Sequence, residues 1–132
     1  MRRKRIAALM AGVDQEYQQG FTWGMYKASQ EKDADLCIFN CQGHADGFER
    51  DDSGERVIFS LPNLQDFDGV VLLLETIPTK VCREEILQRL SEVPQLPLVT
   101  VDCQWGQSVS ITFDDNTSVR ELICLLYTSD AA

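Results

Sequence analysis

The sequence has few basic residues and no long hydrophobic run. It contains 12 Lys and Arg against 21 Asp and Glu, which gives a formal net charge of -9 at pH 7. This balance argues against nucleic-acid binding by this segment, because neutralising phosphates requires clustered Lys and Arg. No stretch approaches the roughly twenty apolar residues that span a bilayer. We therefore expect no membrane and no nucleic-acid contact.

The motifs of many enzymes and metal sites are also missing. No G-x-G-x-x-G follows a predicted strand and no Walker loop occurs, so the usual phosphate cradles are absent. The single histidine, His44, is interpreted as a surface residue rather than a general base. Cys37 and Cys41 lack a second ligand pair, so core packing is favoured over metal binding. Cys82, beside Arg83, is interpreted as a surface cysteine at a helix start. We predict no catalytic residue, no metal and no cofactor.

Cysteine usage and the basic N-terminus indicate a compartment. Five cysteines are an odd number, and their spacing matches no disulfide framework. Free cysteines of this kind are typical of a reducing environment, so we predict a cytoplasmic protein. The basic run 2–5 is followed by a short apolar stretch without a small-residue cleavage site. We interpret this run as a solvated lead-in to a buried strand rather than a signal peptide.

Short apolar runs alternate with helical patterns along the chain. Helices are predicted at 17–32 and 83–93, and a third runs from Asn116 or Thr117 through Val119, Leu122 and Ile123. The stretch 41–54 is predicted to be a loop, and 57–64 is ambiguous, with a broken helix near Pro62 as one reading. The predicted strands are 5–12, 36–39, 69–74, 98–101 and 109–113. This alternation predicts an α/β fold, a doubly wound parallel five-stranded sheet with helices on both faces.

The first predicted helix carries a row of small residues. Gly20, Gly24 and Ala28 recur at helical spacing, beside Tyr17 and Phe21. Small side chains let a helix lie close against a sheet. We therefore expect this row to face the sheet.

Polar residues follow every predicted strand. They are 14–17, 40–42, 75–76, 102–103 and 114–116. In an open α/β sheet the ligand binds outside the carboxyl ends of the strands, so these groups are candidates for ligand contact. Polar residues at such turns also act as caps, and capping is favoured for Asp115 and Asn116. Tyr17 either stacks on a ligand ring or packs at the helix start, and the sequence leaves both open.

Five motifs in order resemble one family. They are RIAALMAG (5–12), EYQQGFTWGMYKAS (16–29), FDGVVLLLET (67–76), LPLVTVD (96–102) and SVSITFDDNTSVRELI (108–123). Their order and spacing are similar to the N-terminal lobe of the periplasmic-binding-protein-like domain of the lactose-repressor and ribose-binding-protein type. The resemblance runs from about Arg5 to Ile123. It implies the strand order 2-1-3-4-5 and a two-lobed ligand sensor without catalysis, of which this chain is the first lobe.

The resemblance also implies a binding site. Carried over by position, the ligand-facing residues are Glu16, Tyr17, Gln42, Glu75, Asp102 and Asp115. The family often has Arg after the Asp of the fourth strand, whereas this chain has Cys103, so a usual sugar contact is missing. A small polar ligand of the sugar or polyol class is expected, and the acidic residues suit a cationic ligand equally.

The partners implied by the resemblance lie outside this segment. A hinge to the second lobe is expected after a sixth strand, and a homodimer is expected in the intact protein. The pattern is most similar to cytoplasmic sensor domains of transcription regulators or signalling proteins. Their output domain follows the sensor, as a diguanylate cyclase with a GGDEF motif or an AraC-type DNA-binding domain.

The last nine residues, Cys124 to Ala132, do not continue the family pattern. CLLYTSDAA is the translation of a common transposase-type sequencing adapter. We therefore expect 1–123 to be a truncated lobe and 124–132 to be a non-native tail. Leu125 and Leu126 are expected to extend the last helix all the same.

Two other functions stay open from the sequence. One is a small flavodoxin-like enzyme, although the first loop, DQEYQQG, lacks the Ser, Thr and Gly residues that hold a flavin phosphate. The other is a lobe that has lost ligand binding and serves only for dimerisation.

Overall fold

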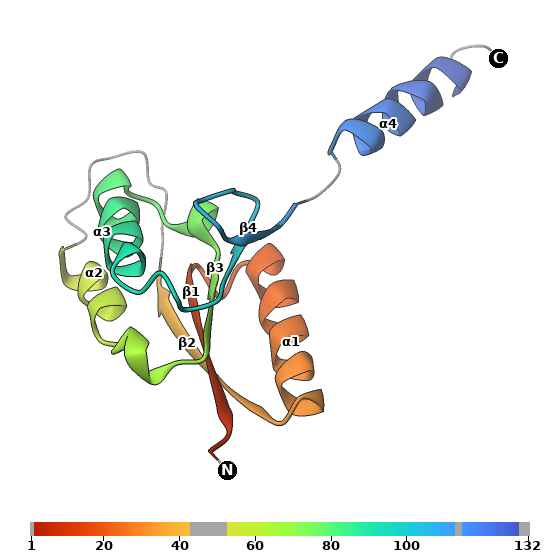
Figure 1. Cartoon of the computed structure of the whole chain (residues 1–132). Helices are drawn as coiled ribbons and strands as arrows, with labels where there is room; N and C mark the ends of the chain where they lie inside the picture. The colour runs from red at the N-terminus through yellow and green to blue at the C-terminus, as the bar shows by residue number, and fades with distance from the viewer. Residues whose placement is uncertain (1, 43–52, 113–114, 130–132) are drawn as a thin grey trace.

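The computed structural model describes residues 2–42, 53–112 and 115–129, and these contain five strands and four α-helices (Figure 1). The strands are β1 (Lys4–Ala11), β2 (Ala34–Cys41), β3 (Gly69–Leu72), β4 (Leu98–Val101) and β5 (Val109–Ile111). The helices are α1 (Glu16–Glu31), α2 (Ser53–Ser60), α3 (Lys80–Ser91) and α4 (Asp115–Ser129), with short 3₁₀ turns η1 (Leu64–Asp66) and η2 (Leu74–Thr76).

The five strands form one all-parallel sheet in the predicted order, β2-β1-β3-β4-β5. Ala8 of β1 pairs with Ile38 of β2 on one side and with Val71 of β3 on the other. At the far edge, Thr100 of β4 pairs with Ser110 of β5. Strand β1, between β2 and β3, is buried from Ala7 to Ala11, as its apolar run predicts.

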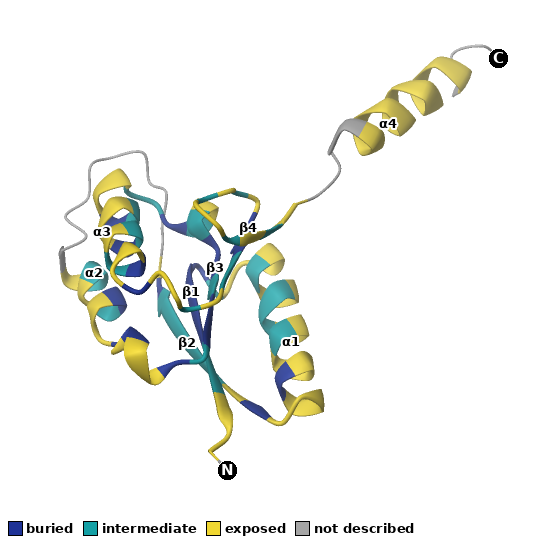
Figure 2. Ribbon diagram, viewed as in Figure 1, coloured by how far each residue is buried: buried dark blue, intermediate teal, exposed yellow. Residues whose placement is uncertain are grey.

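Side chains alternate between the two faces of the sheet. On the face covered by α2 and α3, Leu9 and Leu72 pack against Ile86 in the larger core cluster. On the face covered by α1, a smaller cluster centres on Met10 and Leu73. Figures 1 and 2 show α1 on one side of the sheet and the α2–α3 pair on the other. Helices therefore cover both faces, as predicted.

Helix α2 begins in a stretch that was predicted to be a loop. It starts at Ser53, whereas the predicted loop extends to Gly54 and the ambiguous segment begins only at Val57. It ends at Ser60, two residues before Pro62, because proline disfavours helical backbone in the residue that precedes it. Arg89 of α3 then donates hydrogen bonds to the carbonyl oxygens of Phe59 and, at 2.6 Å, Pro62. This arginine joins the end of α2 to α3.

The row of small residues on α1 does not face the sheet, so that prediction is wrong. A Cβ added at Gly20 or Gly24 would meet no atom within 4 Å. The side of α1 that faces the sheet carries Ser29, which is buried, and Thr22, whose hydroxyl lies 3.8 Å from the sulfur of Met10. Gly20 and Gly24 lie away from these positions around the helix, and they border open space.

Helix α4 forms as predicted, and it extends through Leu125 and Leu126. It stands apart from the sheet (Figure 1), and all of its side chains from Thr117 to Thr128 are exposed (Figure 2). Val119 and Leu122 are among the exposed apolar residues. Within the described ranges, none of the helices has the length and apolar character needed to cross a membrane.

The basic N-terminal run is neutralised at the amino edge of the sheet. Arg2 forms an ion pair with Asp68 at 3.2 Å, and Arg3 forms ion pairs with Asp33 and Asp35. The backbone N–H of Arg5 donates to Asp68, and this bond, followed by the charge of Arg2, lowers the pKa of that carboxyl. The run is thus a lead-in to β1, as interpreted from the sequence.

Candidate functional site

The carboxyl end of β1 turns sharply into α1. Gly12 adopts a φ of +68°, which favours glycine, and its N–H donates to the carbonyl of Cys41 at 2.8 Å. A Cβ at this position would lie 3.2 Å from Nε2 of Gln18. This turn places the first residues of α1 directly over the ends of the central strands.

Two polar groups at this edge hold the backbone. Thr76 Oγ1 accepts from the N–H of Ala11 at 2.9 Å and donates to the carbonyl of Leu73 at 2.6 Å. Asn40 Oδ1 accepts from the N–H of Val13 at 3.0 Å. Both residues were candidates for ligand contact by position. The structure uses them to tie the β1 loop to β2 and η2.

Tyr17 and Asp102 meet across this edge. The Tyr17 hydroxyl donates a hydrogen bond to the carboxylate of Asp102, which follows β4 and has a φ of +56°. Partial burial, followed by this hydrogen bond and the negative charge of Asp102, raises the pKa of Tyr17 to about 12. The phenol is therefore neutral over the physiological range and acts as a donor.

Cys103 and Glu75 complete the group. Burial raises the pKa of the Cys103 thiol, and the charges of Glu75 and Asp102 add to the effect. The carbonyl of Cys103 accepts hydrogen bonds from the hydroxyls of Thr100, at 2.7 Å, and Ser110, at 2.6 Å. These bonds fix the turn after β4. We refer to Tyr17, Glu75, Asp102 and Cys103 as the strand-end site.

The structure does not bring the other predicted residues into this group by any hydrogen bond or ion pair among the described residues. Glu16, the residue before Tyr17 in the first turn of α1, is exposed. Gln42 follows β2 and is also exposed. Asp115 begins α4, which stands away from the sheet, and its side chain lies outside the described residues. Of the six predicted residues, Tyr17 and Asp102 are in contact, and Glu75 lies near enough for its charge to act on the Cys103 thiol.

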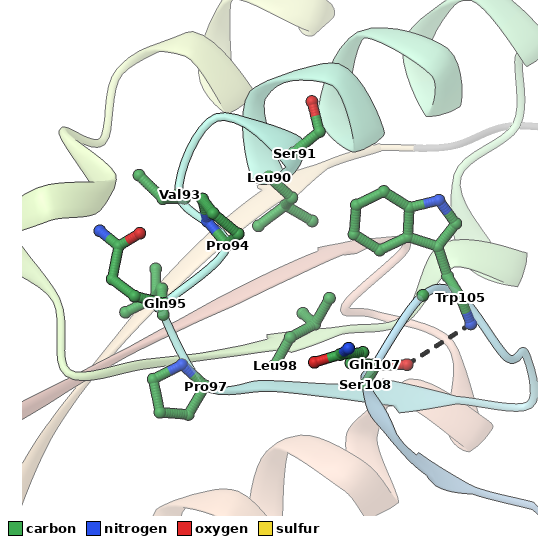
Figure 3. Close-up of a pocket in the computed structure, with 12 residues that line it drawn as sticks. Leu90, Ser91, Val93, Pro94, Gln95, Pro97, Leu98, Trp105, Gln107 and Ser108 are labelled. Atoms are coloured by element: carbon green, nitrogen blue, oxygen red, sulfur yellow. Dashed lines mark hydrogen bonds between the residues drawn. The ribbon is translucent and has the colours of Figure 1, made fainter.

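A separate cavity of about 300 Å³ lies between the end of α3 and the β4–β5 connection (Figure 3). Leu90, Leu98 and Trp105 form much of its wall, and the connection, residues 102–108, contains no helix. The Ser108 hydroxyl lies 3.1 Å from that of Thr100 and accepts from the N–H of Trp105, as the dashed line in Figure 3 shows. The cavity is lined mostly by apolar side chains, and in this it differs from the polar ends of the strands.

The cysteines lie mainly in the core. Cys41 is buried and Cys37 packs against the same cluster, which agrees with the predicted packing role. Cys82 is also buried, in α3, so its interpretation as a surface residue is wrong. It lies on the inward face one turn before Ile86, in a helix that begins at Lys80 and not at Arg83 as predicted. His44 lies outside the described residues. No three His, Cys, Asp or Glu side chains gather as a metal site within the part of the chain that the structure describes.

A scan against protein-family models found no match, and no curated protein matches the chain.

Proposed function

We propose that this chain is one lobe of a two-lobed ligand sensor that binds a small polar molecule, of the sugar or polyol class, between its lobes. It belongs to a transcription regulator or signalling protein of the cytoplasm and performs no catalysis itself. The observation that carries the proposal is the strand-end site, where the Tyr17 hydroxyl of α1 donates to Asp102 at the end of β4 and the charge of Glu75 in η2 acts on Cys103.

The position of this site in the sheet supports binding. The chain moves outward from β1 to β2 and then returns to β3 on the other side of β1. Ligands of open α/β sheets bind outside the carboxyl ends of the strands at such a reversal of strand order. Tyr17 lies in the first turn of the helix after β1, and Glu75 follows β3. The site is therefore next to the reversal.

The chemistry of the site suits a donor-rich ligand. Carboxylates of Glu75 and Asp102 accept hydrogen bonds from hydroxyl or ammonium groups, and the ring of Tyr17 offers an apolar face. Cys103 stands where the resembled family often has Arg, so a side chain that donates to a sugar oxygen is replaced by a thiol. This difference favours a polyol or an amine over an anionic ligand.

The exposure of the site supports a second lobe. Tyr17 is 44% exposed, and Glu75 and Asp102 are exposed as well. Small-molecule sites usually bury most of the ligand, so a ligand bound here needs a cover from the other side. Helix α4 carries exposed apolar side chains, among them Leu122 and Ile123, that this lobe does not cover. These side chains are available to pack against the second lobe in the intact protein.

Ligand would then act by favouring a closed arrangement of the two lobes. That closure shifts an equilibrium between conformations, which an output domain reads. A diguanylate cyclase or a DNA-binding domain is the output that we propose for the intact protein.

The test is a titration of the isotope-labelled chain followed by two-dimensional NMR, which detects weak binding. The probes are ribose, sorbitol and putrescine, one for each ligand class. We expect at least one probe to shift the backbone amides of residues 12–18, 74–76 and 102–104. The shifts should be lost in Asp102→Asn and reduced in Tyr17→Phe.

A matched control is Asp68→Asn, which removes a carboxylate at the amino edge of the same sheet. It should leave the titration unchanged. If all three probes give no shift, or give shifts that Asp102→Asn does not alter, ligand binding at the strand-end site is contradicted.

A further inference from the structure

The cavity between the end of α3 and the β4–β5 connection takes no part in the strand-end site. Tyr17, Glu75, Asp102 and Cys103 are not among the residues that line it. It is bounded by the last residues of α3, by the loop that leads from α3 to β4, and by the connection that carries Trp105 (Figure 3). We refer to it as the Trp105 cavity.

The size of the Trp105 cavity suits a small organic molecule. Its volume is about 300 Å³, at the lower end of the range of roughly 300 to 1,000 Å³ that ligand pockets occupy. A cavity of roughly 150 Å³ lined by apolar side chains already binds benzene. The Trp105 cavity therefore has room for one ring or two fused rings with a small substituent.

One wall of the cavity is aromatic. The side chain of Trp105 is half-buried, and it packs against the larger core cluster, as Leu98 does. Figure 3 shows the ring of Trp105 and the side chains of Leu90 and Leu98 around the same space. Aromatic rings associate in offset-stacked or edge-to-face pairs, and this adds to the gain from burying apolar surface. A ligand with an aromatic ring gains most from such a wall.

The lining of the cavity carries no charge. Of the chain as a whole 25% is charged, yet no Asp, Glu, Lys or Arg is found among the described residues that line this space. Its polar side chains are those of Ser91, Gln95, Gln107 and Ser108, and both glutamines are exposed. Burying a charge without a partner is costly. The cavity therefore suits a neutral molecule whose polar substituent reaches an exposed amide.

Both sides of the cavity are held in place before any ligand binds. In the loop after α3, Pro94 and Pro97 restrict the backbone, and the carbonyl of Pro97 accepts from the N–H of Val70 at 2.9 Å. In the connection, the N–H of Ser108 donates to the carbonyl of Trp105 at 3.1 Å, and the Ser108 hydroxyl accepts from the N–H of Trp105. A preformed site loses less conformational entropy on binding.

We propose that the Trp105 cavity is a second binding site, for a neutral aromatic molecule of one or two rings that carries a hydrogen-bonding substituent, as a phenol or an indole does. The ring packs between Trp105 and the side chains of Leu90 and Leu98. The substituent forms a hydrogen bond with the amide of Gln95 or Gln107.

A buried hydroxyl joins the wall of the cavity to the strand-end site. Thr100 has no exposed surface, and its hydroxyl lies 3.1 Å from that of Ser108 and donates to the carbonyl of Cys103 at 2.7 Å. Ser108 lines the cavity, whereas Cys103 follows Asp102 in the turn after β4. Binding in the cavity therefore also perturbs residues 102–104, and signals from these three residues do not distinguish the two sites.

The test is a titration of the isotope-labelled chain with phenol and with indole, followed by two-dimensional NMR. We expect both probes to shift the backbone amides of residues 90–98 and 105–108. Leu98→Phe fills part of the cavity and should remove these shifts. Trp105→Ala removes the aromatic wall and should weaken the binding of indole by roughly ten-fold.

Two controls separate this site from other surfaces. Trp23→Ala removes the chain's other tryptophan, which is 62% exposed on α1, and should leave both titrations unchanged. Asp102→Asn, which should abolish binding at the strand-end site, should leave the affinities for phenol and indole unchanged. Failure of either site can therefore be told from failure of the other.

Circular dichroism checks the fold of each variant, and Leu98→Phe keeps the test decisive if Trp105→Ala does not fold. The proposal is overturned if neither probe shifts residues 90–98 or 105–108, or if Leu98→Phe leaves the shifts as they are. It is also overturned if cyclohexanol, which has the size of phenol without its aromatic ring, binds as tightly as phenol. Shifts confined to residues 12–18 and 74–76 would contradict it as well, because they would place the probes at the strand-end site.

Discussion

The two faces of the sheet differ in how completely they are covered. The face under α2 and α3 holds the larger core, in which Leu72 and Ile86 are buried almost completely. The face under α1 holds a cluster of three buried residues, Met10, Leu73 and Val101. One face of the sheet is therefore covered by a closed core, whereas the other leaves apolar surface exposed on both sides of a single helix.

The reason lies in the connections. Two helices follow β2 and β3 on the first face, whereas α1 stands alone on the second, and α4 does not pack beside it within the described structure. A helix covers only a strip of a sheet about 10 Å wide. The strips beside α1 therefore stay open, and apolar hollows of about 430 Å³ and 620 Å³ lie on the two flanks of this helix.

The largest expected effect is in the closed core. Leu72→Ala removes a side chain with no exposed surface and should lower the free energy of unfolding by about 3 kcal/mol. Met25→Ala, on the half-buried inner side of α1, should cost about 1 kcal/mol, because less apolar surface is lost. Urea denaturation of both variants measures the difference. Equal losses would show that the two faces are packed equally well.

A smaller loss is expected where α2 joins the closed face. Arg89→Ala removes the donor to the carbonyls of Phe59 and Pro62 and should lower the free energy of unfolding by about 2 kcal/mol. Hydrogen exchange should become faster in α2 before it does in β1. Gln88→Ala, at an exposed neighbouring position of α3, is the control and should change little. An unchanged α2 in Arg89→Ala would mean that other contacts hold this helix.

Much of the fold could be predicted from the sequence, because a short apolar run such as 6–11, followed by Gly12, is typical of a strand buried on both faces. Which side of each helix packs against the sheet was harder to predict from the sequence. Gly20 and Gly24 were expected to form a contact seam, yet the sheet side of α1 carries Phe21, Met25 and the buried Ser29. Cys82 was misplaced because the predicted helix began only at Arg83, whereas α3 begins at Lys80 and buries Cys82 one turn before Ile86.

The edge of the sheet on which these residues lie could be predicted from the sequence, but which side chains contact one another there could not. Parallel topology brings strand ends to one edge, so Tyr17, Glu75 and Asp102 were expected near each other. Their contacts depend on turns that the sequence does not reveal, such as the positive φ of Asp102. Asn40 and Thr76 look equally suitable by position, but backbone N–H groups take their oxygens.

The strand-end site should respond to high pH through Tyr17. Its pKa, about 12, lies above the ordinary value of 10.0, so the stabilisation from the protonated phenol is full below pH 10 and is lost as pH rises through 12. Ultraviolet absorbance titration should show one tyrosine ionising late, and Tyr17→Phe should remove that step. At neutral pH this variant should lose less than about 1 kcal/mol. A late step that persists in Asp102→Asn with its full shift would assign it mainly to burial.

The smallest effect is expected in α4, and it tests the comparison of the two faces most directly. Leu122 is 56% exposed, so Leu122→Ser should change the free energy of unfolding of the lobe by less than about 0.5 kcal/mol. Leu87→Ser is the matched change in α3, where the side chain packs against the larger core. It should lower the free energy of unfolding by more than about 1 kcal/mol. If Leu122→Ser were as costly as Leu87→Ser, α4 would have to bury its apolar side in solution. The open strip beside α1 is the surface best placed to receive it, and the two faces of the sheet would then be equally covered.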